Sequence, residues 1–442
     1  MSLLGERAIV AGAGIGGLIA AGVLAEFFGE VLLLEKDVLP LSPGQRKGVP
    51  QDGQIHVILK GGDNAFAAVF PGFREALADA GAAPLDFGKD LQTYEGGRRH
   101  SPKSTGIVVH SQTRPLLEFT VRTLLAKLAN VRILDQTRLV DILRAPDGPV
   151  TGVAITDKEG QRRDLAADLV VECMGRSGYT GRWLAKNHGR KVAETELGID
   201  LVYTSALLHR TAPWRGRNFG WITRPTAPHN TKSGVLVPIE GERWMMTLSG
   251  RFGEVPPEDE AGFLAYAKAL EDPNVYAEAK VARFATPITS YRIPRMIWRH
   301  YDRVADFPDR LIPLGDTIAG FNPLAAQGMS MAALHAIALR DALHDGLGGL
   351  GGLGGAQGRY MTQAMQIAAD AWSLGELLDF AYPQAKGTRP DDLAERLAAR
   401  AAVFKLATRD EEVRGLIFEV QNMLRPPSAL RDAALLARAF AL

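Results

Sequence analysis

Three glycines near the start of the chain have the spacing of a turn that binds a dinucleotide pyrophosphate. Gly12, Gly14 and Gly17 follow an apolar run at residues 8–11, which predicts a short buried strand. The first glycine permits a tight turn, the second lets the backbone approach the phosphates, and the third allows close packing of helix on strand. A helix over residues 16–28 would direct free N–H groups at the phosphates. We therefore predict a phosphate-binding turn here.

An acidic residue ends the next predicted strand, at residues 31–34. Glu35 follows Gly17 by eighteen positions (35 − 17 = 18), where a carboxylate can accept hydrogen bonds from ribose hydroxyls. The glycine spacing alone is a weak signal, because residues 346–351 also match it. That second copy has no strand before it and no acid after it, and it predicts a flexible linker between helices.

A stretch in the last third of the chain has residue types that suit the other half of such a cofactor. Residues 311–314 predict a short strand, and Asp316, just past its end, can accept a hydrogen bond from a ribitol or ribose hydroxyl. Pro323 fixes a turn, and Gly328 and Met329 open a helix whose N–H groups would face a flavin pyrimidine ring. Contacts from both ends of the chain predict FAD, bound along its length.

Together these motifs resemble the class A FAD-dependent monooxygenases of the aromatic hydroxylase and squalene epoxidase type. They are most similar to the bacterial olefin epoxidases that act on polyketides. The resemblance covers nearly the whole chain, through residues 12–35, 50–56, 113–118, 168–177, 315–329 and 371–383. It implies an α/β fold, in which a Rossmann-like FAD-binding domain of the glutathione reductase type carries an inserted antiparallel sheet. The expected FAD-binding domain is 1–195 with 300–345, the substrate sheet 196–299, and a helical C-terminal region 356–442. Alternating runs at residues 234–238 and 243–248 predict antiparallel strands of the substrate sheet, and residues 259–270 predict a helix on it.

The same resemblance implies further cofactor contacts and a reaction. Arg114 would reach the pyrophosphate, Arg46 would approach the phosphates, and Val140 would lie on the adenine side. One oxygen atom of dioxygen would pass through a flavin C4a-hydroperoxide to a small hydrophobic substrate, as for natural products, by epoxidation or hydroxylation. NAD(P)H would be the direct or indirect reductant. No catalytic side chain is assigned, since the oxidative chemistry belongs to the cofactor.

The chain departs from the family pattern at three sites. Met174–Gly175 stands where single-component hydroxylases carry Asp-Gly, and Thr317–Ile318 stands where many carry Ala-His. These changes predict weak direct reduction by NADPH and electron supply by a separate flavin reductase. Ala326 replaces a glycine before Gln-Gly-Met, so the turn over the flavin is less permissive.

Other flavin proteins remain as alternatives. A flavin-dependent halogenase would need a tunnel lysine and a Trp-x-Trp-x-Ile-Pro string, and the six tryptophans include no such spacing. A reductase that saturates isoprenoid double bonds would share the Gly-Asp pair. A non-catalytic flavin-binding partner protein is an alternative outside enzymes.

Composition excludes several other classes of function. The net charge is +1, from 51 basic and 50 acidic residues, which predicts no attraction to nucleic acid. We expect no membrane span, because no stretch approaches ~20 uninterrupted apolar residues. A single cysteine, Cys173, indicates a reducing, cytoplasmic location. The nine histidines show no metal-ligand spacing, so we expect no metal. His56 lies either near the flavin or in a structural role.

Overall fold

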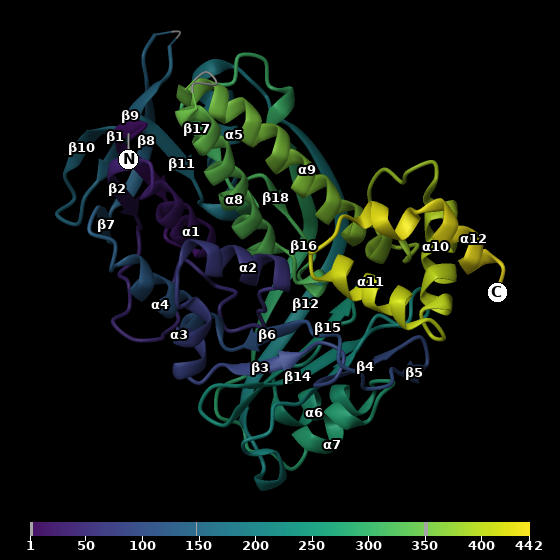
Figure 1. Cartoon of the computed structure of the whole chain (residues 1–442). Coiled ribbons are helices and arrows are strands. Elements are labelled where there is room, and N and C mark those ends of the chain that lie inside the picture. Colours follow the sequence, from purple (N-terminus) through teal and green to yellow (C-terminus); the bar gives the residue numbers. More distant parts are fainter. Residues whose placement is uncertain (1–2, 147, 349–351) are drawn as a thin grey trace.

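A parallel sheet forms the centre of the computed structural model, which describes residues 3–146, 148–348 and 352–442 (Figure 1). Its strand order is β17-β11-β1-β2-β7, and every neighbouring pair is parallel. The strands are β1 (Gly5–Ala11), β2 (Phe28–Leu34), β7 (Val131–Leu134), β11 (Leu169–Glu172) and β17 (Leu311–Pro313). Because the strands are parallel, their carboxyl ends meet at one edge. The glycine turn after β1 and the Gly-Asp pair after β17 therefore come together from opposite parts of the chain.

Helix α1 (Ile15–Leu24) is shorter than the predicted helix at 16–28. Phe28 instead begins β2, where it pairs with Gly5, and Leu4 N–H donates to the carbonyl of Phe27. Phe27 and Phe28 are both fully buried. The apolar run is thus divided between a helix and a strand, since both are buried on all sides and their hydrophobic patterns merge.

Further helices and two small sheets surround the parallel sheet. Helix α8 (Gly328–Leu347), predicted to open at residues 327–329, packs against α1 and α9 (Gly352–Phe380). Residues 349–351 of the predicted linker at 346–351 lie outside the described residues, and Gly346 belongs to the last turn of α8. The other elements are α2 (Lys60–Val69), α3 (Phe73–Asp79), α4 (Arg114–Leu125), α5 (Tyr179–His188), β3 (Ala83–Asp86), β6 (Val108–Ser111), β8 (Arg138–Arg144), β9 (Val150–Thr156) and β10 (Arg162–Ala166).

A larger sheet lies beside this unit in the order β18-β16-β12-β15-β14-β13-β4-β5. Its strands are β12 (Ala193–His209), β13 (Gly220–Thr223), β14 (Ser233–Ile239), β15 (Arg243–Arg251), β16 (Thr289–His300), β18 (Ala319–Gly320), β4 (Leu91–Glu95) and β5 (Arg98–Arg99). The predicted strands at 234–238 and 243–248 form the antiparallel pair β14–β15. β4 and β5 come from much earlier in the chain, and β4 pairs parallel with β13.

The two faces of this sheet contact different partners. On β15, Trp244, Met246 and Leu248 pack in one cluster with residues of α6 (Glu260–Lys268) and α7 (Asn274–Ala279). The intervening residues point to the opposite face, because side chains alternate along a strand. The predicted helix at 259–270 corresponds to α6, which the side chain of Asp259 caps by accepting from Gly262 N–H at 2.8 Å.

The C-terminal region is helical, as predicted. α10 (Leu393–Leu406), α11 (Glu411–Gln421) and α12 (Ala433–Phe440) share a small core of their own, and Pro426–Pro427 separates α11 from α12. In Figure 1 these yellow helices lie beside β4 and β5, and Arg400 of α10 faces Glu95 of β4. Among the described residues, no helix is both long enough and apolar enough to cross a membrane. The predicted α/β fold class is confirmed.

Candidate functional site

One cavity of about 1180 Å³ connects the carboxyl edge of the parallel sheet, one face of the large sheet and the C-terminal helices. Every predicted cofactor residue lines it except Gly17 and Val140. Val140 lies on β8 with 38% of its surface exposed, and its carbonyl accepts a hydrogen bond from the Tyr179 hydroxyl. Its neighbours Thr137, Arg138 and Leu139 do line the cavity.

Each glycine in the turn after β1 is required for a different structural reason. Gly12 has φ of +100°, and a Cβ there would lie 2.8 Å from the carbonyl oxygen of Cys173. A Cβ on Gly17 would lie 1.8 Å from the carbonyl oxygen of Gly12, so Gly17 permits the turn without facing the cavity. Gly14 faces the cavity, where Arg114 Nη2 is the one described atom within 4 Å of an added Cβ, at 3.9 Å. No side chain caps α1 at Gly14 and no acid lies in its first turn, so its positive end faces the cavity.

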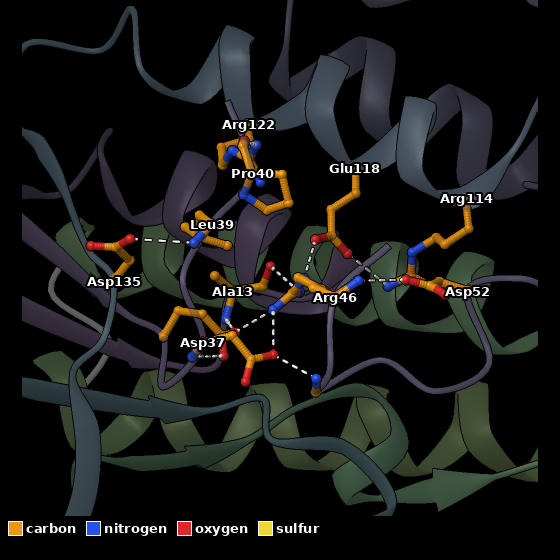
Figure 2. A network of polar contacts seen from close by, with 12 residues as sticks. Ala13, Asp37, Leu39, Pro40, Arg46, Asp52, Arg114, Glu118, Arg122 and Asp135 are labelled. Carbon is orange, nitrogen blue, oxygen red and sulfur yellow. Dashed lines mark hydrogen bonds and ion pairs between the residues drawn. The ribbon is translucent and has the colours of Figure 1, made fainter. Parts of the chain in front are cut away.

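Arg46 lies at the centre of a polar network beside this turn, and only 5% of its side chain is exposed (Figure 2). Its Nη1 lies 2.8 Å from Glu35 Oε2, its Nε donates to Glu118 Oε1 at 2.7 Å, and its Nη2 donates to the Ala13 carbonyl at 3.0 Å. Burial opposes the charge of Arg46, but Glu118 and Glu35 outweigh it and raise the arginine pKa. The loop that carries Arg46 is thereby held against β2, α4 and the glycine turn.

Glu35 is already engaged on both carboxylate oxygens. Oε2 accepts from Ala13 N–H and Oε1 from Asp37 N–H, each at 3.0 Å, in addition to the contact with Arg46. A carboxylate has about four acceptor positions, so about one is left for a ribose hydroxyl. The side chain is nevertheless at the cavity wall, where the sequence motif predicts it.

Arg114 links α4 to the start of α8. It is the first residue of α4, it is buried, and its Nη2 donates to Glu118 at 3.2 Å while its Nη1 lies 3.4 Å from the sulfur of Met329. Its Nε is buried without a partner. Two predicted cofactor residues from distant parts of the chain are thus brought into contact.

The second predicted stretch forms the opposite wall. Asp316 lies in a short 3-10 turn after β17, with 34% of its side chain exposed and Arg176 Nε at 3.6 Å. A Cβ on Gly328 would lie 3.5 Å from Asp316 Oδ1. Gln327 caps α8 without a side-chain bond, no acid lies in the first turn, and the buried Gln327 Oε1 has no partner. A second positive helix end therefore faces the same cavity.

Two residues that the motifs did not single out hold these loops in place. Glu172, fully buried at the end of β11, accepts from Met174 N–H at 2.7 Å and from the hydroxyls of Thr180 and Thr317, each at 3.0 Å. Burial raises its pKa, although these hydrogen bonds oppose the shift. The side chain ties the loop after β11 to the Gly-Asp loop. The only sequence signal was an acid at the end of the apolar run at residues 169–172.

His335 supports the same region from α8. Its Nδ1 accepts from Gly315 N–H at 3.3 Å, and its Nε2 lies 3.1 Å from the carbonyl oxygen of Ala364. Burial lowers its pKa to about 4, so the ring is neutral at neutral pH. A histidine at a buried helical position carries no distinctive sequence signal, because its contacts are set by the packing of α8 on α9.

His56 and Cys173 also line the cavity. The ring of His56 hydrogen-bonds the Gln54 carbonyl through Nδ1 at 2.9 Å. Burial and the charge of Arg114 lower its pKa to about 3. The structure is consistent with both predictions for His56, because its ring makes a structural hydrogen bond and also faces the cavity. Cys173 lies just after β11, and burial raises its pKa well above the usual value. No metal-binding cluster occurs in the part of the chain that the structure describes.

Polar side chains of the large sheet form one wall of the cavity. Thr247, Ser249 and Arg251 of β15 line it, together with Tyr203 of β12. Arg251 is buried and lies 2.5 Å from Asp379 Oδ1, which also accepts from Asn322 at 2.6 Å. This contact places the end of β15 beside the loop that begins α8. Nothing in the sequence pointed to Arg251 or Asp379.

The chain is similar to known proteins in sequence and in fold. No family model matches it. Protein Rv3254 of Mycobacterium tuberculosis is 32% identical over 352 residues, covering 76% of this chain and 73% of that protein.

Solved structures share the fold at low sequence identity. PqsL of Pseudomonas aeruginosa, described as a probable FAD-dependent monooxygenase, has a TM-score of 0.62 and 18% identity, covering 85% of this chain and 96% of its own. The flavin-dependent brominase Bmp2 has a TM-score of 0.69 and 12% identity, covering 99% and 98%. The oxygenase of 2-methyl-3-hydroxypyridine-5-carboxylic acid has a TM-score of 0.60 and 18% identity, covering 84% and 91%. The fold is therefore that of FAD-dependent monooxygenases, and the chain belongs to the family of Protein Rv3254.

Proposed function

We propose that this protein is an FAD-dependent monooxygenase that adds one oxygen atom from dioxygen to an organic substrate, by epoxidation or hydroxylation. The observation that carries the proposal is the single cavity shared by the two FAD motifs and by one face of the large sheet. Its volume of about 1180 Å³ exceeds the ~300–1,000 Å³ of common ligand pockets. It has room for part of a large cofactor and for a second molecule next to it.

The residues at the cavity wall fit FAD. The uncapped start of α1 would hold the pyrophosphate with help from Arg114, and Glu35 would hold the ribose. Asp316 would bind the ribitol, and the uncapped start of α8 at Gly328 and Met329 would face the flavin pyrimidine. The unpartnered Arg114 Nε and Gln327 Oε1 are a donor and an acceptor that a polar cofactor could satisfy.

The protein's own task in this reaction is positioning. Reduced FAD supplies the activation of dioxygen and the transfer of one oxygen atom. The N–H groups that open α8 would stabilise negative charge on the flavin ring. Glu172 and His335 hold the Gly-Asp loop in position relative to the start of α8. The apolar part of the cavity wall would exclude water from the reacting atoms.

A flavin-dependent halogenase is the second candidate, because the Bmp2 structure covers 99% of the chain. Halogenases of this type require a lysine in the tunnel. Lys36 is the one lysine among the described residues that line the cavity. It lies beside Glu35 and pairs with Asp37 at 2.9 Å. That position belongs to the cofactor end, so the cavity favours oxygen transfer.

The first test concerns the cofactor. We predict that the purified protein contains noncovalent FAD, which denaturation releases as a yellow filtrate. A colourless protein that shows no thermal shift on addition of FAD would refute the assignment.

The second test concerns the reaction. The protein is supplied with chemically or enzymatically reduced flavin, labelled dioxygen and candidate alkenes or phenols, with and without halide. Mass analysis should show one labelled oxygen atom in the product, as an epoxide or a hydroxyl group. A halogenated product would indicate the halogenase, a saturated product without oxygen the isoprenoid reductase, and bound FAD without turnover the non-catalytic partner. A polyketide alkene in the panel tests the similarity to olefin epoxidases.

A further inference from the structure

Two arginines with incomplete partners line the cavity on the side of the C-terminal helices. Arg224 directly follows β13, and Arg400 lies on α10. Both face one carboxylate, Glu95 at the end of β4: Arg400 Nη2 lies 3.6 Å from its Oε1, and Arg224 Nε lies 4.0 Å from its Oε2. Neither guanidinium forms a hydrogen bond with any described residue. Two cations therefore share one anion at long range, which leaves a net positive charge.

The pairing of Arg400 differs from that of its neighbour on the same helix. Arg396, one turn earlier on α10, also lines the cavity, but its Nη1 donates to Glu376 at 2.8 Å. Burial and the nearby charge of Arg224 lower the pKa of Arg400, although Glu95 opposes the shift, and 30% of the Arg400 side chain is exposed. Its guanidinium lies over the ring of Phe404, 4.5 Å from the centroid, so its polar edge is left for another partner. Each guanidinium has five donors in a planar fork that matches a carboxylate.

A polar row on the sheet joins this arginine pair to the cofactor end. The row consists of four residues that lie directly opposite one another on neighbouring strands: Ser233, Ser249, Tyr203 and Tyr291. All four line the cavity. Residues in register point to the same face of a sheet. Arg224 follows Thr223, whose partner is Gly234, so it extends this row beyond Ser233.

The row ends close to the predicted flavin site. Arg251 lies two residues after Ser249 on β15 and contacts Asp379, which also accepts a hydrogen bond from Asn322, the residue before Pro323. From Arg224 to Tyr203 is three strand spacings, about 14 Å. Apolar side chains also line the cavity, among them Ile222, Val235, Leu377, Leu378 and Val403.

We infer that the substrate is an elongated carboxylic acid, whose carboxylate binds the donors of Arg224 and Arg400 that Glu95 leaves unused, while its apolar body crosses the sheet toward the flavin. This inference rests on the proposed function, because it names the substrate class of the same cavity. A carboxylate there would complete the donors of both arginines with charge-assisted hydrogen bonds. It also gives α10 a direct part in binding, so that the C-terminal helices recognise the end of the substrate that does not react.

Binding of three matched probes to the FAD-loaded protein tests this inference without requiring turnover. Equilibrium dialysis compares dodecanoate, 1-dodecanol and dodecyl phosphate, which share one chain and differ in the head group. We expect dodecanoate to bind roughly tenfold to a hundredfold more tightly than the alcohol. The inference is overturned if dodecanoate does not bind, if acid and alcohol bind equally, or if the phosphate binds more tightly than the acid.

Substitutions then locate the head group. Arg224→Gln and Arg400→Gln should each weaken dodecanoate roughly tenfold to a hundredfold and leave 1-dodecanol unchanged. Arg409→Gln, on an exposed turn after α10, is the matched control. If Arg400→Gln does not fold, Arg400→Lys keeps the charge without the fork and should lose only part of the affinity. Unchanged dodecanoate binding in folded variants of both arginines overturns the site.

The FAD content of every sample separates the two proposals. Protein that binds no FAD contradicts the proposed function, whereas protein that binds FAD but does not prefer dodecanoate contradicts only the substrate class.

Discussion

Asp316 presents a partly exposed carboxylate to the cavity, and its nearest cation is Arg176 at 3.6 Å. It therefore has more unused acceptor capacity than Glu35, which has about one acceptor position left. If it binds a ribitol hydroxyl, the charge-assisted bond contributes about 1.5–3 kcal/mol. Asp316→Ala should then raise the Kd of FAD roughly tenfold to a hundredfold, as measured by fluorescence titration. Asp345→Ala, at the far end of α8, is the control. Unchanged affinity in folded Asp316→Ala would remove this residue from the site.

His56 should make the protein sensitive to acid. Burial and the charge of Arg114 lower its folded pKa to about 3, from an ordinary value of 6.5. The unfolded chain takes up this proton at a higher pH than the folded chain does. The stability that His56 contributes is thus fully present above pH 6.5 and is lost as the pH falls from 6.5 toward 3.

His56→Gln should remove that part of the acid sensitivity. Between pH 7 and pH 5 the wild type should lose up to about 2 kcal/mol more free energy of unfolding than the variant. Urea unfolding of both proteins at the two pH values measures this difference. His335 adds a similar contribution that both proteins keep, so it cancels. Parallel pH dependence in the two proteins would show that the His56 ring is solvated.

At the level of elements, two helix starts create the cofactor end of the cavity. α1 and α8 both begin without a side-chain cap, and their first residues come from the two predicted motifs. The turn before α8 is strained, because Ala326 has φ of +56° in the left-handed region. This position is the one where a glycine was expected, and the structure supplies the reason, since only glycine adopts that conformation without steric cost.

Ala326→Gly should therefore stabilise the protein. Relief of the left-handed conformation is worth about 1–2 kcal/mol, and the greater freedom of glycine in the unfolded chain offsets about 0.5–1 kcal/mol of it. We expect a net gain near 1 kcal/mol in the free energy of unfolding, measured by urea denaturation. Ala325→Gly, in the preceding 3-10 turn, is the control and should destabilise. A loss of stability in Ala326→Gly would show that the alanine methyl group is needed for packing.

At the scale of the whole molecule, the proposed reaction requires a source of electrons for the flavin. The N-terminal fingerprint would be occupied by FAD, and the loop after β11 holds Met174 where related hydroxylases carry an aspartate. Met174 lines the cavity, but a thioether cannot accept the hydrogen bonds that a carboxylate accepts. Its own N–H is committed to Glu172.

We predict that NADPH alone reduces the bound flavin slowly, and that a separate flavin reductase speeds turnover. Anaerobic stopped-flow bleaching of the flavin absorbance measures the first rate, and product formation with and without added reductase measures the second. Reduction by NADPH alone at a rate that matches turnover would contradict this two-component scheme.

The sequence by itself determined the features that depend on near neighbours in the chain. The turn at residues 12–17, the strand before it and Glu35 after it could be predicted, since a glycine turn and an apolar strand are local requirements. The start of α8 and the antiparallel pair β14–β15 were predicted for the same reason. The end of α1 was not, because one continuous apolar run serves both a buried helix and a buried strand.

Only the tertiary structure decided which side chains meet. Arg46 joins Glu35 to Glu118, and Glu172 reaches Thr317, because the order of the parallel strands brings separate loops to one edge. Likewise, β4 pairs with β13 and α10 packs beside it, which places Arg224 and Arg400 on either side of Glu95. Such contacts join residues far apart in the chain, and no local periodicity or motif records a distance across the fold.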